Sequence, residues 1–188
     1  MTLIIEIMNV RRVKVLLTFL VILCLSAHPL EAQLSKGFHN DTCPQAESIV
    51  RKEVFKAFLN DSGLAAGLVR MHFHNAFVTG ADGSVLIDST SNNTAEKDAP
   101  TNNPSLRGFE VIDNVKVKLE ASCKGKVSCA DILAFAARDS ILLSSGLFYE
   151  VPAGRRDGNV LLASEALANL PPPIANLDQL TRSFAMKT

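Results

Sequence analysis

The chain has 188 residues, of which 47% are hydrophobic and 20% charged, and its 19 basic residues balance its 19 acidic ones. This length suits one globular domain. The zero net charge gives no electrostatic basis for binding nucleic acid or an anionic membrane surface, which argues against protein classes that depend on such binding.

The first 32 residues are predicted to be a secretory signal peptide. Arg11, Arg12 and Lys14 precede an apolar stretch at 15–27, and the small residue Ala32 provides a cleavage position. A membrane anchor is the less favoured interpretation, because this stretch is shorter than the ~20 residues that span a bilayer. We therefore expect a secreted protein, extracellular or in the cell wall, with a mature domain at 33–188 and no membrane contact after cleavage.

The cysteines agree with secretion but leave one thiol over. Removal of the signal peptide takes away Cys24 and leaves Cys43, Cys123 and Cys129. Secreted proteins seldom keep an unpaired cysteine, so either one thiol is free or its partner lies outside this chain. Glycosylation sequons, which are typical of secreted surfaces, begin at Asn40, Asn60 and Asn92.

Helical periodicity predicts a mostly α fold with long connections. Apolar residues recur at helical spacing in 45–60, 64–77 and 106–122, with a short helical piece at 166–170 and an amphipathic helix at 177–187. Ser128, followed by Asp131, predicts a capped helix whose body at 132–143 is apolar nearly all round and therefore central and buried. Residues 79–105 show no helical period, and a connection of this length is usually functional or disordered.

The clearest chemistry lies in the segment 70–84. On a helix, Arg70 and His74 are four positions apart and share a face. A neutral imidazole could accept a proton there while the guanidinium stabilises negative charge. His72 diverges from His74 and is interpreted as a core histidine. The same structural interpretation stays open for His74.

The residues that follow supply oxygen atoms suited to a hard cation. Asn75, Asp82 and Ser84 offer side-chain oxygens, while Gly80 and Gly83 allow the backbone to turn its carbonyls inward. Calcium binds six to eight such oxygens. The spacing of an EF-hand is absent and one Asp provides little charge, so an ordinary polar turn is the alternative interpretation.

A series of motifs, taken together, resembles the secretory plant peroxidases (class III haem peroxidases). They are Arg-x-His-Phe-His at 70–74, Val-x-Gly-x-Asp-x-Ser at 78–84, Glu-Lys-Asp at 96–98, Arg-Gly-Phe at 107–109, Val-Ser-Cys-Ala-Asp at 127–131, Val-Pro-x-Gly-Arg-Arg-Asp at 151–157 and Asn-Leu-Pro at 169–171. The resemblance implies a haem-peroxidase-like helical fold, a haem b cofactor and a monomer that uses H₂O₂ to oxidise phenolic donors. It also implies roles in oxidative stress and cell-wall phenolic metabolism.

The resemblance further implies roles for individual residues. His74 matches the distal histidine that takes a proton from H₂O₂, and Arg70 matches the arginine that polarises the peroxide bond. Asn102 matches the hydrogen-bond partner of that histidine, supported by Glu96. The aromatic wall of the pocket corresponds to Phe73, and the proline at which donors bind corresponds to Pro171.

Other matched positions concern metal binding and stability. The distal calcium ligands correspond to Asn75, Val78, Gly80, Asp82, Ser84 and Glu96, with Val78 and Gly80 binding through their carbonyls. By resemblance, Cys43 pairs with Cys123, and Asp131 forms a buried ion pair with Arg155. Cys129 is an orphan thiol whose partner lies near the family's C-terminus.

The sequence departs from the family pattern in two ways. The family has Asp-Cys where this chain has Asn75-Ala76 and a second Cys at Ala81, so one short disulfide is absent and the calcium site is expected to be weakened. The sequence also ends before the family's proximal half, and none of its four histidines holds the position of the iron-binding one.

These departures leave three functional hypotheses. We expect a haem peroxidase by family, with the alternative that this chain is a truncated, non-catalytic fragment that is inactive alone. A calcium-binding wall protein without haem is a third possibility, and it would depend on the weakened site.

Overall fold

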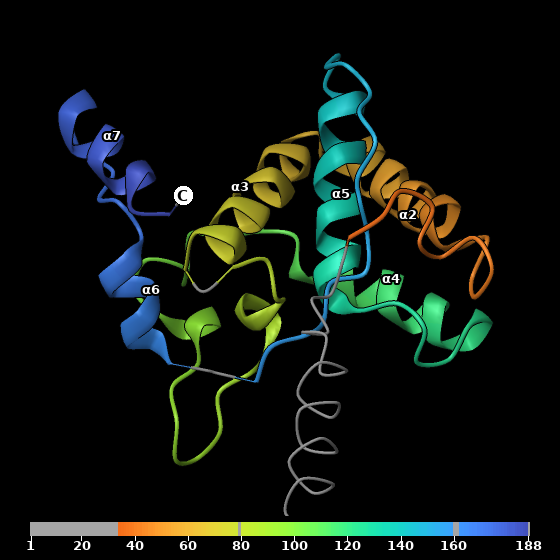
Figure 1. The fold of residues 1–188 in the computed structure, drawn as a ribbon, viewed down its shortest axis with the longest axis horizontal. Coiled ribbons are helices and arrows are strands. Elements are labelled where there is room, and N and C mark those ends of the chain that lie inside the picture. Colours follow the sequence, from red (N-terminus) through yellow and green to blue (C-terminus); the bar gives the residue numbers. More distant parts are fainter. Residues whose placement is uncertain (1–33, 79, 160–161, 188) are drawn as a thin grey trace, which may run out of the picture. The chain divides into compact units, whose positions relative to one another are not determined.

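The computed structural model describes residues 34–78, 80–159 and 162–187, which belong to one compact unit of the chain, Gln33–Thr188. The predicted signal peptide lies outside these residues. The predicted mostly α fold is confirmed for the described part (Figure 1). Its α-helices are α2 (Ala46–Asn60), α3 (Gly63–Val78), α4 (Phe109–Ser122), α5 (Cys129–Leu143), α6 (Ala163–Asn169) and α7 (Leu177–Ala185), and its 3₁₀ turns are η1 (Ser84–Leu86) and η2 (Glu96–Asp98).

Helix α5 forms the centre of the fold. It packs against α3 on one side and against α2 and α4 on the other (Figure 1). Every residue from Ala130 to Ser140 is buried, as the uninterrupted apolar pattern predicted. Leu68 and Met71 of α3 and Val50 and Val54 of α2 complete the core around it. Each such aliphatic side chain contributes about 1.5–3 kcal/mol through burial, so helix packing provides most of the stability.

The N-terminus of α5 is fixed by two side chains. The hydroxyl oxygen of Ser128 accepts the N–H of Asp131 at 3.1 Å, as the sequence predicted. The carboxylate of Asp157 accepts the N–H groups of Cys129 and Ala130 at 3.0 and 2.9 Å. Two carboxylate hydrogen bonds and one hydroxyl cap therefore satisfy the free N–H groups that begin this helix.

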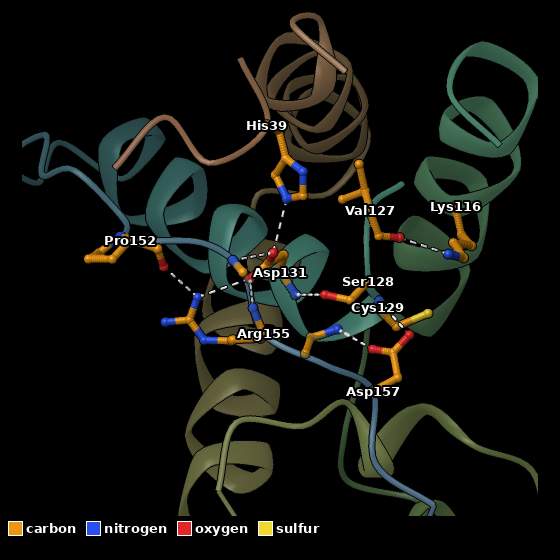
Figure 2. Close-up of polar contacts among 11 residues, drawn as sticks. His39, Lys116, Val127, Ser128, Cys129, Asp131, Pro152, Arg155 and Asp157 are labelled. Atoms are coloured by element: carbon orange, nitrogen blue, oxygen red, sulfur yellow. Dashed lines mark hydrogen bonds and ion pairs between the residues drawn. The ribbon is translucent and has the colours of Figure 1, made fainter. Parts of the chain in front are cut away.

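Asp131 ties α5 to the extended segment that follows it (Figure 2). Its carboxylate accepts the backbone N–H groups of Gly154 and Arg155 at 2.8 and 3.2 Å, and the Arg155 guanidinium at 3.1 Å. The Nε2 atom of His39 lies 3.0 Å from Oδ2, the oxygen that also accepts the Gly154 N–H, whereas both Arg155 groups bind Oδ1. The ion pair that the resemblance implied is thus present, with an additional histidine.

The structure contains a disulfide between Cys43 and Cys123, with a Cα–Cα distance of 5.7 Å. It links the start of α2 to the end of α4, two segments that are 80 positions apart in the sequence. Cys129 is a free cysteine among the described residues. This pattern matches the pairing and the orphan thiol that the resemblance implied.

Helix boundaries depart from the sequence prediction where backbone geometry intervenes. Helix α4 begins at Phe109 rather than at Leu106, because Gly108 has a φ of 100° and cannot continue a right-handed helix. The connection before it is ordered by two 3₁₀ turns and polar side chains. Among the described helices, none combines the length and apolar character needed to cross a membrane.

Candidate active site

Helix α3 brings Arg70 and His74 together on one face. The Nε–H of Arg70 donates to Nε2 of His74 at 3.2 Å. His74 is buried, with 7% of its surface exposed, whereas Arg70 is exposed. The i, i+4 spacing therefore places both side chains on one face, as the sequence predicted, and brings them into contact, with the base inside and the cation at the surface.

Asn102 binds the opposite nitrogen of the His74 ring. Its Oδ1 atom lies 2.7 Å from Nδ1 of His74, and its Nδ2–H donates to the carbonyl oxygen of Glu96 at 2.7 Å. The Glu96 carbonyl can only accept, which fixes the orientation of the amide. His74 must then donate from Nδ1, and its Nε2 atom keeps the lone pair. The surroundings thus select the tautomer of a neutral base.

The protonation of His74 follows from the same surroundings. Burial lowers the pKa of His74 below its ordinary value. The hydrogen bond to Asn102 opposes this shift, and the positive charge of Arg70 adds to it. His74 is therefore a neutral imidazole near pH 7, in the form that can accept a proton.

Ser105 holds the guanidinium of Arg70 and was not identified in the sequence. Nη1 donates to the Ser105 carbonyl and Nη2 to its hydroxyl, both at 3.0 Å. With the bond to His74, all three nitrogens of the guanidinium have partners. The sequence offered no signal for this contact, because Ser105 lies 35 positions from Arg70 in an irregular connection.

Glu96 supports this network through its backbone rather than its side chain. Neither carboxylate oxygen of Glu96 has a hydrogen-bond partner, although the residue is fully buried. Burial raises the pKa of Glu96 to about 7, and the negative charges of Asp82 and Glu165 add to this shift. The expected supporting role is therefore performed by the carbonyl that binds Asn102.

Aromatic residues flank the His74 face. The ring of Phe73 lies edge-on to the His74 imidazole with a centroid distance of 5.8 Å and stacks on Phe184 at 6.1 Å. Phe184 also meets Phe77 at 4.8 Å, although 51% of its own surface is exposed. Pro171 lies half-buried between α6 and α7, and donor binding there stays a prediction.

The expected calcium ligands are bonded to one another and to a lysine. Asn75 Oδ1 accepts the Gly83 N–H at 2.8 Å, and Asp82 Oδ1 accepts the Ser84 hydroxyl at 2.7 Å. The carbonyl oxygen of Val78 accepts the Lys187 ammonium at 3.3 Å. The described residues contain no cluster of three or more His, Cys, Asp or Glu suited to a metal ion. With an amide at Asn75 and an ammonium on the Val78 carbonyl, this donor set attracts calcium less than a set with a carboxylate at position 75 would.

The other candidate residues are not part of the Arg70–His74 pair. His39 is 5% exposed and is bound to Asp131. His72 lies two positions from His74 on α3, and burial and the charge of Arg155 lower its pKa. The sequon asparagines Asn40, Asn60 and Asn92 are all exposed, and their glycosylation stays a prediction.

Comparison with known proteins shows which proteins the chain is similar to. A family model described as "Peroxidase" matches residues 50–188. The chain is 67% identical to Peroxidase 5 of Vitis vinifera, over 89% of this chain and 51% of the relative. It is 54% identical to Peroxidase 1 of Zea mays (83% and 42%) and 53% identical to Peroxidase 3 of Arabidopsis thaliana (84% and 48%).

The chain thus spans about half the length of the curated relatives it matches. The matched region includes the helix that carries Arg70 and His74 and the connection that carries Asn102. Because the family model covers most of the sequence, the chain belongs to the plant peroxidase family.

Proposed function

We propose that this chain provides the distal half of a secreted, monomeric haem peroxidase that uses H₂O₂ to oxidise small phenolic donors. Oxidative-stress responses and cell-wall phenolic metabolism are the processes that such an enzyme serves. The hydrogen-bonded series from Arg70 through His74 and Asn102 to the Glu96 carbonyl carries the proposal. It holds a neutral base beside a fixed positive charge.

Haem, when bound, would supply the iron and the electrons for cleavage of the peroxide O–O bond. His74 Nε2 accepts a proton from one peroxide oxygen and donates it to the other, which leaves as water. Peroxide must first replace the Arg70 Nε–H that occupies this lone pair. The Asn102 bond at Nδ1 keeps the ring oriented during both transfers.

Arg70 acts on the charge that develops as the bond breaks. Its guanidinium is anchored to Ser105 by two hydrogen bonds, so its remaining freedom is small. A positive group held in advance stabilises the departing oxygen without reorganising during the reaction. Phe73 and Phe184 would keep bulk water from one side of this space.

For the isolated chain, we propose a second function, that of a non-catalytic fragment. The relevant observation is the environment of the other described histidines. His39 is buried and bound to Asp131, and His72 is half-buried on α3 two positions from His74, so we assign neither as an iron ligand opposite His74. A calcium-binding wall protein without haem is less well supported, because the expected ligands are bonded to other groups.

A haemin titration tests both proposals. The full chain alone should give no stable histidine-ligated Soret spectrum. A chimera that joins this chain to the remaining half of the Vitis vinifera relative should bind haemin stoichiometrically and oxidise guaiacol with H₂O₂. A chimera that binds haem but is inactive would contradict the enzymatic proposal. Guaiacol oxidation by the chain alone would contradict the fragment proposal.

A further inference from the structure

We propose that the ammonium group of Lys187 takes the place of a bound calcium ion at the end of α3, so that the adjoining turn at residues 80–84 keeps its structure without calcium. This inference rests on the proposed peroxidase site only for the identity of the expected calcium ligands. Its test uses neither haem nor peroxide, so the two proposals can fail separately.

Lys187 joins the C-terminal ends of three helices. Its Nζ donates to the carbonyl of Val78, the last residue of α3, at 3.3 Å. It also donates to Oδ1 of Asn169, the last residue of α6, at 2.6 Å. Lys187 itself follows the end of α7 at Ala185, and its ammonium lies 5.5 Å from the centroid of the Phe77 ring.

These contacts suit a positive charge. The last carbonyls of an α-helix lack partners within the helix and carry the negative end of its dipole. The aromatic face of Phe77 also attracts a cation. The ammonium thus has favourable partners in two acceptors and one ring, and one acceptor is the Val78 oxygen that calcium was expected to use.

Asn75 also makes the expected calcium site less favourable for a divalent cation. The residue is fully buried, and its Oδ1 accepts the Gly83 N–H at 2.8 Å. Its Nδ2 has no hydrogen-bond partner. A carboxylate at this position would attract a divalent cation, whereas a neutral amide brings N–H donors that oppose one.

The turn itself is closed by hydrogen bonds within the protein. Asp82 Oδ1 accepts both the backbone N–H and the hydroxyl of Ser84, at 3.1 and 2.7 Å. The Asp82 carbonyl accepts the Gly158 N–H at 2.7 Å, which ties the turn to the segment after α5. These bonds maintain the turn without a metal ion.

The test measures thermal unfolding of the full chain in calcium and in EGTA, together with calcium binding by calorimetry. Wild type should give the same Tm in both buffers. Lys187→Met should lower the Tm in EGTA by about 2–4 °C through loss of the helix-end charge. Lys187→Arg should keep the wild-type behaviour. Lys52→Met, which removes an exposed lysine of α2, is the matched control and should leave the Tm unchanged.

Restoring the expected ligand chemistry should restore calcium binding. Asn75→Asp should bind calcium more tightly than wild type, and Asn75→Asp with Lys187→Met should bind it at least about tenfold more tightly, a difference of ~1.4 kcal/mol. A wild-type Tm that falls in EGTA would overturn the proposal. So would a double variant with wild-type calcium affinity, or a Lys187→Met variant that matches Lys52→Met.

Discussion

Replacing Asn102 with Ala removes the amide that connects His74 to the backbone of Glu96. Asn102 is 1% exposed, and both of its hydrogen bonds are 2.7 Å long. Truncation leaves the Nδ1–H of His74 buried without a partner, whereas the Glu96 carbonyl still accepts the backbone N–H of Ala99 at 3.0 Å. One unsatisfied buried donor destabilises the fold by about 1–3 kcal/mol, so we expect the free energy of unfolding to fall by about 1–3 kcal/mol.

Urea unfolding of the full chain, followed by far-UV circular dichroism, measures this loss directly. The slope of the transition should stay unchanged, because the surface exposed on unfolding is the same. Asn114→Ala, at an exposed position of α4, is the control and should alter stability by no more than about 0.5 kcal/mol. Equal stability of the two variants would refute the role assigned to Asn102.

Further predictions concern His72, Cys129 and the disulfide. Burial and the charge of Arg155 lower the pKa of His72 in the folded protein. Below about pH 6.5 the unfolded state therefore binds a proton at His72 more readily than the folded state does, so the free energy of unfolding falls as the pH falls. His72→Gln should lessen that fall, as measured by urea midpoints at about pH 7.5 and about pH 5. Burial and the charge of Asp157 raise the pKa of the Cys129 thiol, so iodoacetamide should alkylate it more slowly than free cysteine. Cys43→Ser should lower the free energy of unfolding by about 2–5 kcal/mol in the same urea assay.

The helices could be predicted because their signals are local. The apolar run at 132–143 and the cap at Ser128 are read from neighbouring residues, and both describe α5 as the structure has it. The start of α4 was placed too early because Gly108 has a φ of 100°, which the apolar periodicity of 106–122 does not reveal.

The candidate site could be predicted only in part, because sequence signals are local and some of its contacts join distant segments of the chain. Arg70 and His74 share a helix, so their spacing alone predicted that they share a face, where the structure has them in contact. The contacts of Ser105 with Arg70 and of Lys187 with Val78 join segments 35 and 109 positions apart and leave no local pattern. The sequence did not indicate which atoms of Glu96 support the network, because it does not reveal which backbone carbonyl accepts a bond.

The proton-transfer role of His74 is tested most directly by the single-turnover reaction of the chimera with H₂O₂, followed by stopped-flow absorbance in the Soret region. His74→Ala should retain stoichiometric haem but react about 10²–10⁴-fold more slowly, which is the usual contribution of a positioned base. His72→Gln should react at the wild-type rate. An unchanged rate in His74→Ala would contradict the assignment of the base.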